Sequence, residues 1–456
     1  MQSNTPDPFA PLDSGIQAGG ANPQALDALG IPEHLRQFEA SHEAALHRLK
    51  AVRPGTYART RNALDGGVTG LSPYFTHGLL GMQQAVQTIH SRHPLGFDDK
   101  LAFEFAWREF FHHVWSRAPG GADAILKDLH GSPPYRGTYN RVLPDDIRQG
   151  RTGVPAIDSA VRTLYATGYL HNHARMWLAS YVVHVRKVHW RAGADWLYSH
   201  LLDGDLPSNH LSWQWVAATF SSKPYLFNAE NVLRYAPAGA QAAWACSGTV
   251  VDTSYEALDL MARDKRDAGP EHAPHGAPWP AITEPAVAGS PPADILTFLA
   301  SFMPVVTADI DDYAMNNIAY TSLELVHPWA VSPRPATQGS GQGRIGVIHL
   351  PAHRQWPWSA RRWQFVLRAM ASVCDAVWIG DLRQFKPEQF GLKHGAGGRV
   401  TAQATLFPGY REALASAADV TPAPRWLPNP TMLCRSFTKF YTRAQQDAGP
   451  FEGLLS

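Results

Sequence analysis

The sequence contains little cysteine, almost no net charge and no long apolar run. Its three cysteines, Cys246, Cys374 and Cys434, are widely spaced, so they cannot supply the four thiolates of an iron–sulfur cluster, and they fit a reducing cytosol. The 40 basic residues nearly balance the 39 acidic ones, so any nucleic-acid site has to be a local patch. No apolar stretch reaches the roughly 18 residues of a membrane span, and the first residues form no signal peptide. These absences predict a soluble, cytoplasmic protein that no membrane holds.

Hydrophobic residues are plentiful and include 15 tryptophans in 456 residues, enough for two or three domains with helical cores. Residues 1–30 are rich in Pro, Gly, Asn and Ala, which predicts a loosely attached leader. A helix is expected to begin near Pro32. Residues 241–292 contain a Pro/Ala/Gly linker. Beyond it, residues 293–456 alternate strand-like and helix-like pieces from Arg344 onward, which predicts a small parallel sheet.

The most informative stretch is residues 201–223, LLDGDLPSNHLSWQWVAATFSSK. It combines a tight turn, Asp203-Gly204-Asp205, with Asn209 and a helix that begins near two tryptophans. Paired carboxylates in such a turn could accept hydrogen bonds from the ribose hydroxyls or ring N–H groups of a cofactor. An ordinary Asp-Gly turn followed by an amphipathic helix explains this stretch equally well.

A second polar segment lies in residues 57–81, which form a Gly-rich and hydroxyl-rich loop that leads into a helix. Backbone N–H groups of residues 68–72, with the hydroxyls of Thr69 and Ser72, could bind a pyrophosphate at the start of that helix. A plain helix start, with Ser72 as N-cap and Pro73 at the first helical position, is the alternative. Both interpretations can hold at once.

Two further helices present polar groups among aromatic and apolar ones. In the helix after Asp98, residues 104, 107, 108 and 111 share one face and combine a carboxylate, an indole and a guanidinium; a surface ion pair beside core aromatics is the alternative. A helix from Pro155 is expected to stop at Gly168, and the next to run from His171 to about Val188. The pairs His171/His173 and His112/His113 lack the spacing of a zinc helix, so we expect no metal site.

Residues 150–191, GRTGVPAIDSAVRTLYATGYLHNHARMWLASYVVHVRKVHWR, together with DGDLPSNHLSWQW, resemble the flavin-binding helical domain of the DNA photolyase/cryptochrome family. The resemblance covers roughly residues 32–237. It implies FAD as cofactor and a mainly α fold, with the photolyase-like domain at residues 31–240 and a small α/β region at 293–456. Members of the family usually carry an antenna domain before the flavin domain, and only some fifty residues precede it here. The α/β region could be a displaced antenna-like domain, and the antenna chromophore stays unknown.

The resemblance also implies roles for individual residues. Those expected to bind FAD are Tyr57, Thr69, Gly70, Leu71, Ser72, Arg108, Asn172, Arg175, Asp203, Asp205 and Asn209. Those expected to meet a pyrimidine dimer are Glu104, Trp107, Asn172, Met176 and Trp215. In addition, Arg175 is expected to pair with an aspartate of the turn. Met176 by itself could equally be a core filler.

For electron transfer, Trp213 matches the tryptophan nearest the flavin and Trp190 the middle one. The outer tryptophan of the family is absent, so Tyr139 or Tyr135 is a candidate end of the route. Seven basic residues are candidates for contacts with DNA phosphates: Arg61, Arg141, Arg148, Arg151, Arg186, Lys187 and Lys223.

Together these features predict a deoxyribodipyrimidine photolyase-like lyase that repairs cyclobutane dimers in UV-damaged DNA with light. The alternative from another class is a cryptochrome-like blue-light receptor that binds FAD and repairs nothing. A third possibility, a flavin-domain protein that only mediates interactions, would be favoured by a colourless preparation.

Overall fold

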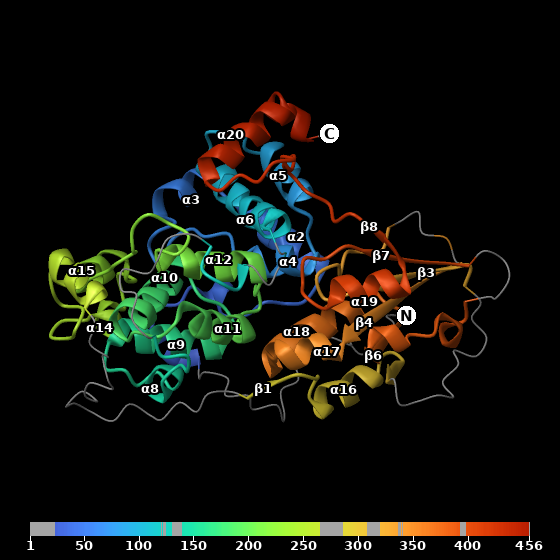
Figure 1. Cartoon of the computed structure of the whole chain (residues 1–456), viewed down its shortest axis with the longest axis horizontal. Coiled ribbons are helices and arrows are strands. Elements are labelled where there is room, and N and C mark those ends of the chain that lie inside the picture. The colour runs from blue at the N-terminus through green and yellow to red at the C-terminus, as the bar shows by residue number, and fades with distance from the viewer. Residues whose placement is uncertain are drawn as a thin grey trace, which may run out of the picture.

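The computed structural model describes residues 23–119, 121, 125–129, 139–264, 286–307, 320–335, 339, 341–392 and 398–455. A helical part formed by the first half of the chain lies beside an α/β part formed by the second half (Figure 1). This arrangement confirms the predicted fold class.

The helical part consists of α1 (Pro23–Ala28), the 3-10 turn η1 (Glu33–Leu35), α2 (His42–Ala51), α3 (Pro54–Thr60), α4 (Ser72–His77), α5 (Met82–His90), α6 (Lys100–Arg117), α8 (Asp145–Arg148), α9 (Pro155–Thr167), α10 (Asn172–Ser180), the π-helical turn η2 (Tyr181–Val185), α11 (Trp190–His200), α12 (Leu206–Val216), α13 (Ala229–Tyr235), α14 (Gln241–Trp244) and α15 (Tyr255–Arg263). Local signals set several of these bounds. Pro155 opens α9, and Gly168 ends it in the left-handed conformation (φ 68°) that glycine adopts without strain.

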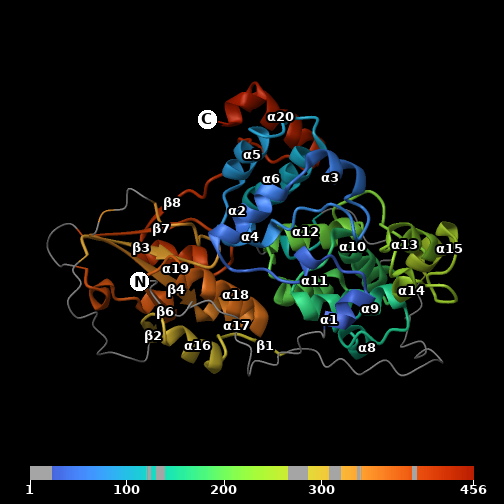
Figure 2. The ribbon, with the colours of Figure 1, turned by 180° about the vertical axis from the view of Figure 1, so that it is seen from behind.

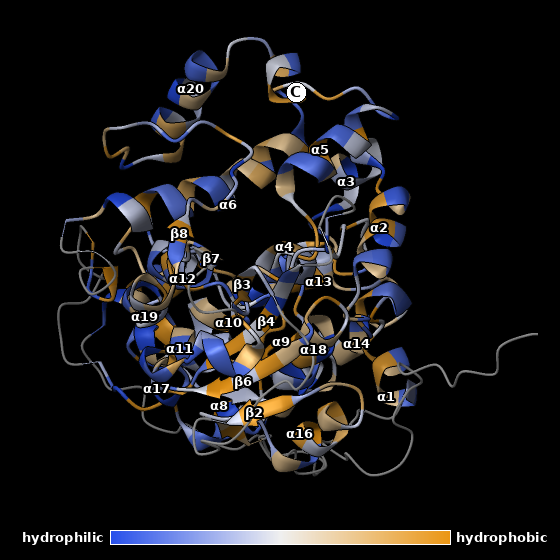
Figure 3. Cartoon of the chain, turned by 90° about the vertical axis from the view of Figure 1, so that its right-hand side faces the viewer, coloured by the Kyte–Doolittle hydropathy of each residue, from blue (hydrophilic) through white to orange (hydrophobic). Residues whose placement is uncertain are grey.

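The α/β part consists of β1 (Val287–Ala288), α16 (Ala293–Ala300), β2 (Val305–Thr307), β3 (Ser322–Val326), β4 (Gln342–His349), α17 (Leu350–Gln355), β5 (Trp358–Ser359), α18 (Ala360–Ala371), β6 (Ala376–Gly380), η3 (Leu382–Gln384), η4 (Pro387–Phe390), β7 (Arg399–Gln403), α19 (Tyr410–Ala417), β8 (Asp419–Thr421), α20 (Phe437–Ala448) and η5 (Phe451–Leu455). Six strands form one sheet in the order β2-β6-β4-β3-β7-β8, and every neighbouring pair is parallel. The central strands are apolar (Figure 3), as expected of a parallel sheet covered on both faces. The parallel sheet is therefore confirmed.

Buried apolar side chains form two clusters. One joins α2 and α4–α6 to the sheet and to the C-terminal helices, and the other lies within α1 and α8–α15. The end of the chain returns to the helical part, where α20 lies beside α5 and α6 (Figures 1 and 2). Two polar contacts join the C-terminal segment to α6. The Arg425 guanidinium pairs with Glu109 at 2.6 Å, and the Cys434 amide donates to His113 at 2.8 Å.

Three expectations about local structure need correction. Residues 23–28 of the expected leader form α1, and Leu26 and Leu29 are buried, because they pack against the second cluster. The helix expected near Pro32 begins only at His42, because the Ser41 hydroxyl caps it by accepting from the Ala44 amide at 3.1 Å. The helix expected to reach Val188 ends at Val185, after its last turn widens to a π-helix. None of the described helices is long and apolar enough to cross a membrane.

Candidate functional site

The Asp203-Gly204-Asp205 turn connects α11 to α12, and Asp203 is bound from two sides. Nη2 of Arg175 on α10 donates to both of its carboxylate oxygens, at 2.8 and 3.0 Å. The Ser72 hydroxyl, at the start of α4, donates to Oδ2 at 2.6 Å. The predicted pairing of Arg175 with the turn is therefore confirmed. Because Asp203 is buried, this ion pair joins the loop before α4 to α10 inside the helical part.

Asp205 caps α12 and collects positive charge from α6. Its Oδ2 accepts from the backbone amide and the hydroxyl of Ser208, and the same carboxylate contacts His112 at 3.0 Å and Arg108 at 3.4 Å. Burial alone would raise the pKa of Asp205, but the charges of Arg108 and His112 hold it well below its usual range. The carboxylate is thus already saturated by protein donors. Its part in cofactor binding stays a prediction.

Glycine is required at position 204 because another side chain lies too close for a Cβ atom. The turn conformation does not require it, since the φ of Gly204 lies outside the left-handed region. A Cβ atom on Gly204 would lie 2.3 Å from Nη1 of Arg362 and 2.8 Å from the Tyr198 carbonyl oxygen. Arg362 belongs to α18 of the α/β part and donates to the Gly204 carbonyl at 2.6 Å. Sequence patterns missed this residue, because it lies 158 positions further along the chain.

The predicted phosphate loop packs directly before α4. Gly70 has φ +60°, the Thr69 hydroxyl accepts from the Leu71 amide at 3.3 Å, and Leu71 is fully buried. The helix begins at Ser72 with Leu71 as its cap, one residue earlier than expected. Pro73 has no amide N–H and the Tyr74 amide donates to the Leu71 carbonyl at 3.0 Å, so Ser72 is the residue at this helix start whose amide has no partner within the helix. Tyr57 lies nearby on α3, where burial and then the charge of Glu104 raise its pKa.

On α6, the Trp107 indole stacks on Phe437 of α20, with ring centroids 4.1 Å apart and planes 12° apart. The sequence did not predict this partner, which comes from the end of the chain. Glu104 is partly exposed and pairs with Lys100 at 2.8 Å and with Arg61 at 3.5 Å. Arg61 therefore has a carboxylate partner beside the position expected for the dimer.

The other residues expected to meet a dimer reach the surface. Asn172 is exposed and its Nδ2 lies 3.4 Å from the sulfur of Met176, one turn further along α10. Trp215 on α12 is 37% exposed and tilts against Tyr225 at 6.1 Å. Because α12 packs against both α6 and α10, the helices that carry these five residues are neighbours. That the five side chains meet at one site stays a prediction.

Trp213 and Trp190 are buried, in contrast to Trp215. The Trp213 ring lies against Gly193 of α11, where a Cβ atom would be only 2.3 Å from the indole, and Gly193 follows Trp190 by one turn. Trp190 donates to Asp128 at 2.8 Å and contacts the His189 ring at 5.4 Å. The His189 ring in turn lies 6.5 Å from that of Tyr139. The His189 ring thus lies between Tyr139 and Trp190, and Tyr135 lies outside the described residues.

Asn209 on α12 lies between these two sets. Its Nδ2 donates to the Ala194 carbonyl of α11 at 2.8 Å, which turns its Oδ1 away from α11. No described residue donates a hydrogen bond to that oxygen. Asn209 therefore presents one open acceptor beside the buried indoles.

Two of the expected phosphate contacts are wrong. Arg186 is buried and pairs with Asp146 at 2.6 Å, and Lys187 is buried and donates to the carbonyls of Met261 and Ala262. Both side chains serve the packing of the helical part. Arg141, Arg151 and Lys223 are exposed, as a DNA contact requires.

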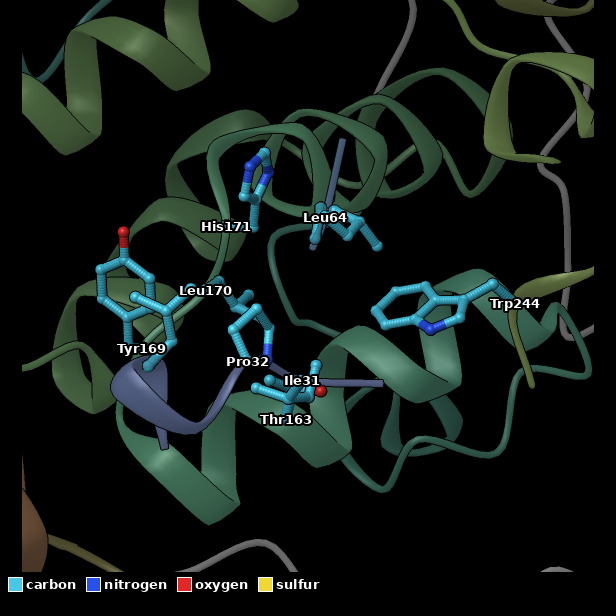
Figure 4. Close-up of a pocket in the computed structure, with 10 residues that line it drawn as sticks. Ile31, Pro32, Leu64, Thr163, Tyr169, Leu170, His171 and Trp244 are labelled. Atoms are coloured by element: carbon cyan, nitrogen blue, oxygen red, sulfur yellow. The ribbon is translucent and has the colours of Figure 1, made fainter. Parts of the chain in front are cut away.

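A small cavity, lined in part by Tyr169, lies between α9, α10 and the turn before η1 (Figure 4). Its volume is about 20 Å³, enough for one water molecule. Burial lowers the pKa of His171, which lines it, to about 3. The lining is apolar apart from Thr163, Tyr169 and His171, so the cavity cannot hold a dinucleotide. Within the described residues no cluster of His, Cys, Asp or Glu could hold a metal ion.

Comparisons with known proteins identify relatives of this chain. The family described as "FAD binding domain of DNA photolyase" matches residues 101–240. A deoxyribodipyrimidine photo-lyase of Thermus thermophilus is 35% identical over 219 residues, 46% of this chain and 51% of that protein. A cryptochrome DASH of Idiomarina loihiensis is 31% identical over 217 residues, 45% of this chain and 47% of that protein. The chain thus spans about half the length of these curated relatives.

Among solved structures, the cryptochrome of Synechocystis sp. PCC6803 matches 45% of this chain and 46% of its own. The identity is 28% and the TM-score 0.40.

Proposed function

The chain carries an FAD-binding domain of the photolyase/cryptochrome family, and from this we propose that it is a light-driven enzyme that splits cyclobutane pyrimidine dimers in DNA. One observation carries the proposal. The five residues expected to meet the dimer are all partly or fully exposed, whereas Asp203, Asp205, Trp190 and Trp213 are buried. A base flipped out of DNA has to reach a cofactor that the protein shields from water.

The donor set fits FAD. A carboxylate can accept about four hydrogen bonds, and Arg175 and Ser72 use three of those positions on Asp203, which leaves one for a ribose hydroxyl or a ring N–H. The Oδ1 of Asn209 offers a second acceptor. Arg108 and the amide of Ser72 can supply positive potential for a pyrophosphate. When bound and reduced, FAD supplies the electron that starts ring opening in light.

The chain's own residues then bind and orient the dimer. Trp215 offers an aromatic face on which a flipped base can stack, and Trp107 offers the face that Phe437 does not cover. Such stacking offsets the few kcal/mol that flipping costs. Glu104 presents a carboxylate next to Trp107 on the same face of α6, where it can bind the polar edge of a base. Asn172 and Met176 line the neighbouring face of α10.

The test is repair of a dimer-containing oligonucleotide by pre-reduced protein under blue light, with bound FAD quantified first and a dark sample as control. We expect dimers to disappear only in light. Glu104→Gln should slow repair while FAD content stays constant, because Glu104 is assigned to the substrate. If Glu104→Gln repairs dimers as fast as the wild type in light, Glu104 does not bind the substrate. If FAD-loaded wild type repairs no dimers, the proposed repair activity is wrong.

The second candidate is a cryptochrome-like blue-light receptor. The similarity to cryptochrome DASH favours it. A yellow, FAD-loaded protein that responds to light but leaves dimers intact would establish this alternative.

A further inference from the structure

The guanidinium of Arg362 is a fully buried charge that joins the α/β part to the turn of the candidate site. The residue is 0% exposed. Its Nη1 donates to the Tyr198 carbonyl near the end of α11, and its Nη2 donates to the Gly204 carbonyl, both at 2.6 Å. Among the described residues, no carboxylate forms an ion pair with it.

Burial lowers the pKa of Arg362, and the nearby charges of Asp203 and Asp205 act against that effect. The groups in direct contact with the guanidinium are aromatic rings and carbonyls. The guanidinium carbon lies 4.2 Å from the ring centroid of Trp358 and 4.4 Å from that of Tyr198, within the range of cation–π attraction. The Tyr198 carbonyl belongs to the last turn of α11. Carbonyls of that turn have no partner within the helix, and they form the negative end of the helix dipole. Arg362 therefore ties the end of α11 to the middle of the turn.

The turn is built around this side chain. Gly204 has no Cβ, and a Cβ there would overlap Nη1 of Arg362 at 2.3 Å. Asp203 and Asp205, on either side of Gly204, point to different partners, Arg175 and Arg108. Fixing the Gly204 carbonyl fixes the direction in which both carboxylates leave the backbone.

We propose that Arg362 is a positioning residue of the FAD site, through which the α/β part sets the geometry of the turn. The inference rests on the FAD-binding assignment and not on repair. In this proposal the α/β part contributes a side chain that positions the cofactor-binding turn of the helical part. Without the two hydrogen bonds, the turn and Asp203 lose their fixed position and the bound cofactor escapes faster.

The experiment compares the release of FAD from holoprotein after dilution, followed by the fluorescence of free flavin, for Arg362→Met and the wild type. We expect release to be roughly tenfold faster, the scale of one lost hydrogen bond to a charged group. Arg344→Met is the matched control, because Arg344 is equally buried but pairs with Glu324 in the sheet. Its release rate should stay within about twofold of the wild type.

A double-mutant cycle separates positioning from general loss of packing. Gly204→Ala should also speed FAD release, and part of that effect should vanish in the Arg362→Met background, because the methyl group no longer meets the guanidinium. Equal release from Arg362→Met and Arg344→Met, or strictly additive effects of Gly204→Ala and Arg362→Met, would overturn the inference. If Arg362→Met does not fold, Arg362→Lys replaces it, since a lysine lacks the planar fork whose two nitrogens each meet one carbonyl. FAD-loaded wild type that repairs no dimer would refute the proposed function and leave this inference standing.

Discussion

Asp203→Asn should destabilise the protein and weaken FAD binding at the same time. The carboxylate is only 4% exposed and Arg175 meets both of its oxygens. Removing one partner of a buried ion pair costs about 3–5 kcal/mol. The lower end applies here, because Arg175 is partly exposed and keeps its hydrogen bond to the Leu170 carbonyl at 2.8 Å. We therefore expect a loss of about 3 kcal/mol.

The assay is urea denaturation of FAD-free protein at pH 7, with the FAD content of the freshly purified variant measured in parallel. A loss of about 3 kcal/mol corresponds to a melting temperature roughly 3 °C lower if the whole chain unfolds together. Ser72→Ala is the control, because it removes the hydroxyl that donates to Asp203 at 2.6 Å and leaves the ion pair in place, and it should cost about 1 kcal/mol. If Asp203→Asn costs no more than Ser72→Ala, the ion pair does not hold the turn. Full FAD content in Asp203→Asn would refute its place in the cofactor site.

Three further predictions concern other parts of the helical core. Gly193→Ala should cost about 1–3 kcal/mol in urea denaturation, since its methyl group would overlap the Trp213 ring at 2.3 Å, and an unchanged midpoint would contradict that packing. Trp213→Phe should slow photoreduction of bound FAD while pre-reduced protein still repairs; if repair also stops, Trp213 has another role. Burial lowers the pKa of His77 and His184 to about 4, so these histidines take up protons on unfolding. Stability should then be complete above pH 6.5 and fall toward pH 4 by up to about 1.4 kcal/mol per pH unit for each histidine. A flat stability profile between pH 7 and 5 would refute the last prediction.

The elements that could be predicted carry local signals. Pro155 and Gly168 mark α9, and the apolar run from Arg344 marks the central strand β4. Strands β2, β3, β7 and β8 were not predicted, because each has only three to five residues and lacks the fully buried run that marks β6. The sheet was expected, but its six-strand order was not, since a register between distant strands leaves no local mark.

The sequence by itself determined the kind of domain and the cofactor. These follow from short motifs such as Asp203-Gly204-Asp205, in which neighbours along the chain are also neighbours in space. Tertiary structure alone decided that Arg362 fills the space behind Gly204 and that Phe437 stacks on Trp107. It also decided that Arg186 turns inward. Each of these contacts joins residues far apart in the chain, and burial and packing, which no local pattern encodes, select the partners.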